Sequence, residues 1–389
     1  MRVRPVGLVA GNQLRLLECG AEFFPALIAA FDAAKVEIHL ETYMFADDQT
    51  GVSVKAALLR AAARGVAVYV ITDWIGTGRV QSVRLDRDLR AGGVHHRSFN
   101  PWFRRGLART HRKLCVVDRN LAFIGGLNIN DDMISDDAAR IVLPEPRWDF
   151  AVEIHGPLVR LMHLEIEAQW LRMGRLKLLT RWGLFRETRS AREAGNGGGA
   201  LAGLVIRDNL RNRRTIQRVT LQALRSARSS AILSTPYFAP GRKLREALSQ
   251  AAARGIDVTL LLGVGQFRMQ DAVARSFYPK LLQCGVKVVE FRRTQLHAKV
   301  AVVDDDWATV GSSNYDGLSL FLNQEANIVI RDVPFTEQLR GLIEEAVRDG
   351  TTIAPEDFAH VGRLQRIWYG AAYFCYRSLL RIATLGRYS

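Results

Sequence analysis

Two stretches of this chain carry the same pattern, and together they decide the fold. Residues 111–128 read HRKLCVVDRNLAFIGGLN, and residues 297–314 read HAKVAVVDDDWATVGSSN. Both follow one spacing, H-x-K-x4-D-x6-G-x2-N, which begins at His111 and at His297. A second match at all five positions is far beyond the usual chance level of a short motif. The repetition predicts a duplicated domain within one polypeptide.

The residue types in the repeated pattern point to an anionic group. In H-x-K, the histidine and lysine side chains fall on the same face of a strand. A lysine ammonium beside the histidine disfavours a metal, because it repels cations and has no lone pair to donate. Two histidines, two lysines and two asparagines around one phosphate would supply a nucleophile, a proton carrier and several hydrogen-bond donors. The pattern therefore predicts phosphodiester chemistry that needs no metal and no cofactor.

The doubled motif resembles the phospholipase D superfamily, and the flanking sequence resembles its bacterial cardiolipin synthase branch, in the shorter form without membrane-spanning helices. The branch resemblance covers roughly residues 8–345. It rests on the His111 to Asn128 stretch and on four further groups, which are Gly11-Asn12 with Leu16-Leu17 and Gly20, Glu41-Thr42-Tyr43, Trp148-Asp149-Phe150, and His155-Gly156-Pro157. It implies an α/β protein with a duplicated phospholipase D fold: two mixed β-sheets flanked by helices, with the active site between the halves.

The resemblance also implies an activity. One phosphatidylglycerol would give its phosphatidyl group to another, producing cardiolipin and glycerol through a covalent phosphohistidine. His111 would be the nucleophile and His297 the proton donor and acceptor. The phosphate charge would be held by a set of polar side chains, namely Lys113, Lys299, Asn128, Asn314 and Ser312.

Four carboxylates complete the expected site. Asp118 and Asp304 end the HxKxxxxD motifs, but their position at a turn favours a structural role, pinning the loop by side-chain to backbone hydrogen bonds. The resemblance implies an orienting carboxylate further along each half. Asp149 lies 38 residues after His111, and Glu325 lies 28 residues after His297. Such a carboxylate fixes the tautomer of the imidazole and stabilises its charged form.

The sequence departs from the superfamily pattern at three positions. Gly126 stands where many members have serine, which removes one hydroxyl donor from the first half. Arg119 and Asp305 stand where glycine often follows the aspartate. None of the three touches the proposed chemistry, but they weaken the expectation that the halves contribute equally.

Chain length and net charge restrict the class of molecule that the protein can bind. The 389 residues can hold two domains with sizeable cores, and the formal net charge of +15 predicts an anionic partner. Nucleic acid and an anionic phospholipid membrane both fit. A phospholipase D-type hydrolase of phospholipid or nucleic acid is therefore the alternative function, and a non-catalytic membrane scaffold is a weaker one. Nucleic acid is disfavoured because no aromatic-rich strand face suggests base stacking. No P-loop suggests a nucleotide, and no dimer is required.

The cysteines, the other histidines and the N-terminal residues indicate no catalytic or targeting role. The four cysteines show no paired spacing, which predicts free thiols in a reducing compartment. Residues 1–10 contain two arginines and no apolar run of signal-peptide length, so we expect a peripheral protein on the cytoplasmic side of the inner membrane. The six histidines outside the motif are expected to be ordinary core or surface residues: His39, His95, His96, His155, His163 and His360.

We expect four regions along the chain. These are an N-terminal half at 1–188, a glycine-rich linker at 189–204, a C-terminal half at 205–349 and a basic amphipathic tail at 350–389. The segment 172–189 alternates arginines with bulky apolar residues and is expected to lie on a membrane surface. In the tail, Arg363, Arg366, Arg377 and Arg381 fall on one side of a helical wheel, and Leu364, Trp368, Cys375, Leu379 and Ile382 on another.

The uncharged run 367–376 in the tail is about half the length needed to span a bilayer. We therefore expect the tail to lie on the membrane, with capping of the core as the alternative. In each half, strands alternate with helices, which indicates a parallel sheet. We expect helices at 20–34, 54–64 with Ser53 as N-cap, and 83–91 in the first half, and a helix at 272–285 in the second.

Overall fold

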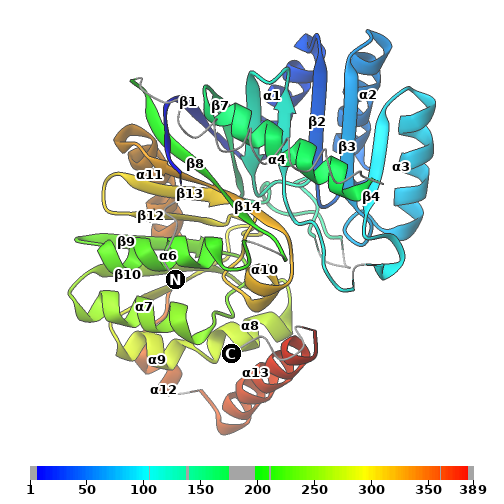
Figure 1. Cartoon of the computed structure of the whole chain (residues 1–389). Helices are drawn as coiled ribbons and strands as arrows, with labels where there is room; N and C mark the ends of the chain where they lie inside the picture. The colour runs from blue at the N-terminus through cyan, green and yellow to red at the C-terminus, as the bar shows by residue number, and fades with distance from the viewer. Residues whose placement is uncertain are drawn as a thin grey trace.

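The computed structural model describes residues 7–104, 106–136, 140–174, 198–209, 212–359 and 361–383. These residues form a sheet of 15 strands in the order β15-β11-β10-β9-β12-β13-β14-β8-β1-β7-β6-β5-β2-β3-β4 (Figure 1). The first strand of each half, β1 (Val9–Glu18) or β8 (Ala200–Arg207), lies near the middle of this order. The two halves therefore spread outward from one central pair of strands.

The N-terminal half runs outward from β1 in the order β7-β6-β5-β2-β3-β4. Strands β2, β3 and β4 are parallel, and β5, β6 and β7 are antiparallel to their neighbours. The elements after β1 are α1 (Cys19–Ala33), β2 (Glu37–Thr42), α2 (Gln49–Ala63), β3 (Ala67–Asp73), α3 (Arg79–Ala91), β4 (His95–Phe99), a 3-10 turn η1 (Pro101–Phe103), β5 (Leu114–Val117), β6 (Leu121–Gly125), β7 (Phe150–His155) and α4 (Leu158–Met173).

The C-terminal half repeats this plan outward from β8, in the order β14-β13-β12-β9-β10-β11. Its elements are α6 (Thr215–Ser226), β9 (Ser230–Thr235), α7 (Arg242–Ala253), β10 (Asp257–Gly263), α8 (Arg268–Arg275), α9 (Tyr278–Gln283), β11 (Lys287–Phe291), β12 (Val300–Val303), β13 (Trp307–Gly311), α10 (Gly317–Phe321), β14 (Glu325–Arg331) and α11 (Val333–Arg348). Three further elements follow this repeat: β15 (Thr351–Thr352), α12 (Pro355–Ala359) and α13 (Arg363–Ala383). The duplication and the mixed sheets predicted from sequence are confirmed.

The two expected sheets are joined at their edges. β1 pairs with β8 in antiparallel fashion, and the register shifts between Val9 and Asn12. The buried Asn12 side chain bridges this irregularity, because its Nδ2 donates to the carbonyls of Val9 and Ala200 while its Oδ1 accepts from the Leu158 N–H. The side chain thus satisfies backbone groups that the broken ladder leaves free.

Three hydrophobic clusters fill the space between sheet and helices. In the N-terminal half, α1, α2 and α3 pack on one face of the sheet. In the C-terminal half, α6, α7, α8 and α9 do the same. The third cluster is shared by both halves, with α4 and α11 against the central strands (Figure 1). This shared core fixes the halves relative to each other, so that a site between them is preorganised.

Two local expectations differ from the structure. Helix α2 begins at Gln49, because the side chain of Asp48 accepts from the Gly51 N–H at 2.8 Å and acts as the N-cap. Ser53 lies within the helix and donates its hydroxyl to the Gln49 carbonyl. The single helix expected at 272–285 is divided into α8 and α9, because Pro279 has no N–H to continue an α-helical ladder.

The predicted regional boundaries are only partly described. Strand β8 begins at Ala200, inside the stretch 189–204 that we assigned to a linker. The division into regions otherwise stays a prediction. Most of the basic segment at 172–189 lies outside the described residues, as do 189–197 of the linker and 384–389 of the tail. All four cysteines are free thiols, as predicted.

Candidate active site

The two motif histidines lie where the halves meet. The His111 N–H donates to the Gln324 carbonyl at 2.8 Å, and the His297 N–H donates to the Trp148 carbonyl at 2.9 Å. Thr110 and Gln324 form one isolated β-bridge, and Leu296 and Trp148 form another. The residue before each histidine therefore pairs with the residue just before Glu325 or Asp149 in the opposite half. Both histidines are buried. The backbone thus delivers the two imidazoles to one interface.

The orienting carboxylates are exchanged between the halves. His111 Nδ1 lies 3.0 Å from Oε2 of Glu325, and His297 Nδ1 lies 2.5 Å from Oδ2 of Asp149. Our expectation that each histidine pairs with the carboxylate of its own half was wrong. The reason is the central β1–β8 contact, which sets β7 and β14 so that each strand begins beside the other half's motif. A carboxylate's distance along the sequence gave no sign of this exchange.

The contacts of His111 fix its tautomer. Its Nδ1 faces two acceptors, the Glu325 carboxylate and the Ser312 carbonyl at 3.1 Å. The ring proton of the neutral imidazole must therefore lie on Nδ1, which leaves the lone pair on Nε2. Burial lowers the pKa of His111 below its ordinary value, against the opposing effect of Glu325. At neutral pH, His111 therefore offers an uncharged Nε2 suited to nucleophilic attack.

His297 lies in a more strongly charged setting. Its Nδ1 contacts Asp149 and also Lys299 Nζ, at 2.7 Å. Its Nε2 lies 3.6 Å from Oδ2 of Asp136. Burial, assisted by Lys299, holds the pKa of His297 well below its ordinary value. Carboxylates on both sides of the ring nevertheless suit the charged imidazolium, so a proton arriving at His297 finds two anionic partners.

The two motif lysines are buried beside the histidines. Lys113 Nζ donates to the His111 carbonyl at 2.8 Å and lies 5.3 Å from the centre of the Tyr43 ring. Lys299 Nζ contacts Asp149 at 3.3 Å. Burial and the charge of Lys299 lower the pKa of Lys113 to about 7. The charge of Lys299 repels that of Lys113, and an anion bound beside both would relieve this repulsion.

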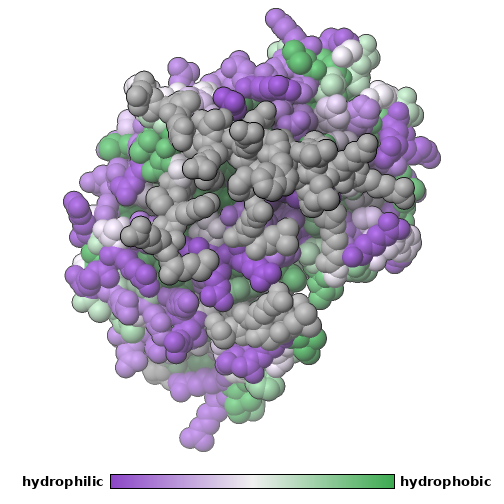
Figure 2. Space-filling view, in the orientation of Figure 1, coloured by the Kyte–Doolittle hydropathy of each residue, from purple (hydrophilic) through white to green (hydrophobic). Residues whose placement is uncertain are grey.

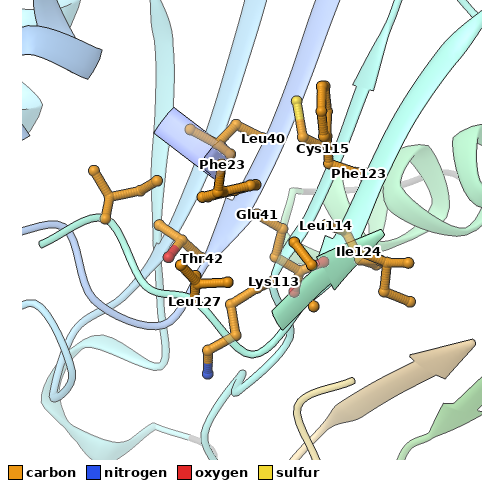
Figure 3. Close-up of a pocket in the computed structure, with 13 residues that line it drawn as sticks. Phe23, Leu40, Glu41, Thr42, Lys113, Leu114, Cys115, Phe123, Ile124 and Leu127 are labelled. Carbon is orange, nitrogen blue, oxygen red and sulfur yellow. The ribbon is translucent and has the colours of Figure 1, made fainter. Parts of the chain in front are cut away.

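A small cavity borders Lys113 on its apolar side (Figure 3). It is lined largely by apolar side chains, among them Phe23, Leu40 and Leu127, and the Lys113 side chain points away from them. Its volume of about 10 Å³ holds at most about one water molecule. The cavity is therefore a packing feature behind Lys113 and is too small for a lipid headgroup.

The predicted phosphate ligands divide into two groups. Asn128 and Asn314 are buried, and the Oδ1 atom of each has no hydrogen-bond partner in the described part of the chain. Ser312 differs, because its hydroxyl donates to Oε2 of Glu325 and accepts from the Ala326 N–H. We expected Ser312 to donate to the phosphate, but in the structure its hydroxyl donates to Glu325 instead. Its single hydroxyl proton already orients Glu325, and through it His111.

The glycine that replaces serine in the first half has a steric reason. Gly126 occupies the position that Ser312 occupies in the second half. A Cβ at Gly126 would lie 2.2 Å from Oδ1 of Asp149, which is far inside van der Waals contact. The shorter aspartate therefore requires glycine beside it, whereas the longer Glu325 is paired with serine. The two histidine–carboxylate pairs are built differently.

Asp118 and Asp304 lie at the far end of their strands from the histidines. The Asp118 carboxylate accepts the N–H groups of Lys35, Val36 and Glu37, at 2.8 to 2.9 Å. The Asp304 carboxylate does the same for 228–230. The structural role expected for both is confirmed, although the loop they pin is the preceding helix–strand connection. They contact neither imidazole and are removed from the catalytic set.

Sequence reasoning missed the residues that support the motif. Asp136 reaches His297 Nε2 and pairs with the buried Arg147. Thr110 is held by Asp73, which accepts its N–H at 2.9 Å, and by Glu41, which accepts its hydroxyl. Of these, Glu41 alone carried a signal, since it lies in the Glu41-Thr42-Tyr43 group. Asp136 follows no repeated spacing and could not have been found.

Comparisons with known proteins agree with this geometry. The family profile described as "Cardiolipin synthase, PLD-like domain" matches residues 27–143 and 220–347, once in each half. Cardiolipin synthase B of Escherichia coli (strain K12) is 39% identical over 338 residues, which cover 85% of this chain and 79% of that protein. Cardiolipin synthase of Geobacillus thermodenitrificans is 31% identical over 361 residues, covering 91% of this chain and 69% of that protein.

Among solved structures, phosphatidylserine synthase of Haemophilus influenzae superposes with a TM-score of 0.69. The match covers 98% of this chain and 97% of that one, at 15% identity, and so concerns the fold alone. The two profile matches coincide with the two copies of the motif, and both copies contribute to one site between the halves. The chain belongs to the cardiolipin synthase family of phospholipase D-like proteins.

Proposed function

We propose that this protein is a cardiolipin synthase that transfers a phosphatidyl group from one phosphatidylglycerol to the hydroxyl of another. The observation that carries the proposal is the pair of buried imidazoles, each oriented at Nδ1 by a carboxylate of the opposite half. This arrangement leaves Nε2 of His111 for the substrate, and Nε2 of His297 faces the substrate side with Asp136 at 3.6 Å. Two such nitrogens suit a reaction with one nucleophile and one proton carrier, which then exchange a leaving alcohol for an incoming one.

In the first step, His111 Nε2 attacks the phosphorus of the donor phospholipid. The bond between phosphorus and the glycerol headgroup oxygen breaks, and that oxygen takes the proton of His297 Nε2. Glycerol leaves, and the phosphatidyl group stays bound to His111. Glu325 stabilises the positive charge that develops on the ring of His111, because its carboxylate accepts the Nδ1 proton.

In the second step, the free hydroxyl of the acceptor phosphatidylglycerol gives its proton to His297 Nε2. The resulting oxygen attacks phosphorus, the phosphorus–nitrogen bond breaks, and His111 returns to its neutral form. Atoms and charges balance over the two steps without any other reactant. Asp149 and Asp136, on either side of His297, support its charged form before the first step and after the second.

The lysines and asparagines would hold the phosphate through both steps. Lys113 and Lys299 are buried, so their charge acts at low dielectric and stabilises the anionic transition state more than it would in water. Burial of the site also keeps bulk water from the phosphohistidine. Water in place of the acceptor would release phosphatidic acid, and the protein would then act as a hydrolase.

Helix α13 supports a membrane partner. One stripe packs on the C-terminal half through the buried Tyr369 and Ala372, so the helix also caps the core, and Leu380 further along the helix is buried too. A second stripe carries four arginines, and a third, on the far side, is apolar and exposed. The exposed apolar residues are Leu364, Ile367, Trp368, Phe374, Leu379 and Ile382. Figure 2 shows hydrophobic side chains interleaved with hydrophilic ones in the region of α13, at the lower edge of the view.

An exposed apolar stripe beside arginines fits the headgroup boundary of an anionic bilayer. We infer that α13 lies along the surface of the cytoplasmic leaflet and delivers the site to its lipid substrates. No helix among the described residues has the length and apolarity required to cross a membrane.

The proposed activity is tested by incubating the purified protein with phosphatidylglycerol vesicles in EDTA at 20 °C. Thin-layer analysis would follow the lipids, beside His111→Ala and His297→Ala. We expect cardiolipin and released glycerol from the wild type alone. Phosphatidic acid as the sole product would show a hydrolase, and degradation of DNA without any lipid product would show a nuclease.

A further inference from the structure

A second cluster of titratable side chains lies on β2 and α4, away from the candidate active site. It consists of Glu37, His39 and His163, and their potential ligand atoms all lie within 4.8 Å of one another. His163 Nε2 is 2.8 Å from Oε1 of Glu37, and His39 Nε2 is 3.6 Å from Oε2. Both imidazoles are buried. One carboxylate is therefore approached by two ring nitrogens from two different elements.

The contacts within the cluster are poor as hydrogen bonds. His163 Nε2 makes no hydrogen bond of acceptable geometry in spite of its 2.8 Å approach to Glu37. A buried ring nitrogen without such a partner is costly, because it has lost its water. The two rings meet edge to face, at 89° with centres 5.2 Å apart, so their nitrogens converge on the carboxylate without stacking.

We propose that Glu37, His39 and His163 bind a divalent transition-metal ion of the Zn²⁺ type. Two imidazole nitrogens and one carboxylate oxygen form a common ligand set for such ions, whereas Mg²⁺ and Ca²⁺ prefer oxygen ligands alone. Ligand distances of about 2.0 to 2.2 Å require only small side-chain adjustments from the present separations.

The surroundings of the cluster suit this ligand set. The His39 ring is buried, and its Nε2 faces the Glu37 carboxylate. The ring is also stacked on Tyr69, with centres 4.7 Å apart, which fixes its plane. The largely exposed Arg119 donates through Nε to Oε1 of Glu37 at 2.6 Å and, more weakly, through a second nitrogen to Oε2 at 3.5 Å. Arg119 then acts as an outer partner of the ligating carboxylate.

The bound ion would join α4 to the sheet. Glu37 and His39 lie on β2, at the end distant from Glu41, and His163 lies on α4. The same end of β2 is pinned by Asp118, and α4 carries Glu165, which pairs with the buried Arg112 next to His111. The site is therefore structural: it secures the helix that supports the catalytic motif and takes no part in phosphoryl chemistry.

The test uses the full chain with any affinity tag removed, stripped with a chelator and then titrated with Co²⁺ and Zn²⁺. We expect one equivalent of Co²⁺ to give the visible absorption of a nitrogen- and oxygen-ligated ion, which Zn²⁺ displaces. We expect Zn²⁺, but not Mg²⁺, to raise the unfolding temperature by about 3 °C or more. His163→Gln and Glu37→Gln should weaken binding at least about tenfold, since each removes one of three ligands.

Glu37→Gln keeps the size of the side chain, so it separates the loss of a ligand from a loss of folding. The matched control is His155→Gln, because His155 lies 3.5 Å from Glu153 of the same strand, β7, and belongs to no group of three potential ligands among the described residues. That variant should bind Co²⁺ as the wild type does. Full-affinity binding in His163→Gln, loss of binding in His111→Ala instead, or no Co²⁺ spectrum in the wild type would overturn the proposal.

Discussion

His111 Nδ1 lies 3.0 Å from Oε2 of Glu325, a residue 214 positions further along the chain and in the other half of the molecule. The reciprocal pair, His297 and Asp149, is exchanged in the same way. Neither half therefore contains a complete histidine–carboxylate pair of its own. The exchange ties the proposed chemistry to the contact between the halves, since separating them would leave both imidazoles without their orienting groups.

The exchanged pairing predicts which carboxylate supports which step. Glu325→Gln should impair the nucleophile His111, whereas Asp149→Asn should impair proton transfer by His297. A phosphatidyl diester with a p-nitrophenol leaving group distinguishes them, because p-nitrophenol leaves without a proton donor. We expect Asp149→Asn to keep a burst of p-nitrophenol and then stall. In Glu325→Gln, the rate of the burst should fall by about 10⁴-fold, as when a triad carboxylate is neutralised.

His111→Ala and His297→Ala are the reference variants for this experiment. The first should resemble Glu325→Gln and the second should resemble Asp149→Asn. If each histidine acted with the carboxylate of its own half, the two patterns would be reversed.

The sequence predicted most residues of the site but not which of them contact one another. The repeated spacing identified both histidines and both lysines, because covalent spacing along a strand fixes which side chains share a face. It could not pair His111 with Glu325, since that contact depends on how two sheets join at β1 and β8. Asp136 could not be identified from the sequence for a similar reason. Its position comes from a loop packed on the other half.

The lowered pKa of Lys113 predicts the alkaline limb of the pH profile. A lysine is charged below its pKa, and that of Lys113 is about 7 in the free protein. The value of kcat/KM for an anionic diester should therefore fall as the pH rises through about 7. The acid limb should lie below 6.5, because burial lowers the pKa of His111 and acid must protonate its nucleophilic nitrogen.

Lys113→Arg tests this assignment, since a guanidinium stays charged over the whole range. We expect a slower enzyme whose kcat/KM no longer falls near pH 7. An unchanged alkaline limb in this variant would show that another group titrates there. A water-soluble diester with a p-nitrophenol leaving group should be used, so that neither vesicle binding nor proton donation by His297 contributes to the profile.

Replacement of Gly126 by alanine should impair activity more than replacement of any other glycine of the site. In Gly126→Ala, the new Cβ would meet Asp149 at 2.2 Å and displace the carboxylate from His297. We expect lipid transfer to fall at least about 100-fold, because small misplacements of a catalytic group carry such penalties. Gly241→Ala is the matched control, since nothing lies within 4 Å of a Cβ there and its φ is −65°. Equal activity of the two variants would contradict the steric argument.

Asp118 allows a separation of stability from catalysis. Its carboxylate accepts three backbone N–H groups, and hydrogen bonds to a charged group contribute about 1.5 to 3 kcal/mol each before compensation. Asp118→Ala should lower the free energy of unfolding by about 3 kcal/mol, measured by urea denaturation. Its kcat at 20 °C should stay within about tenfold of the wild type, because the residue contacts neither imidazole. Asp47→Ala, at an exposed position, should change neither quantity. A folded Asp118→Ala protein without activity would return the residue to the catalytic set.

Helix α13 should determine vesicle binding through its exposed apolar stripe. Ile367 and Phe374 are 66% and 73% exposed, and glutamate at both positions would bring like charge to an anionic bilayer. We expect at least about tenfold weaker flotation with phosphatidylglycerol vesicles, together with a normal unfolding temperature, because the buried stripe of α13 is untouched. The control replaces Val36 and Val52 with glutamate; both lie outside α13 and are 63% and 50% exposed. It adds the same charge to the whole protein, so equal loss in both variants would indicate a net-charge effect and would argue against a docking role for α13.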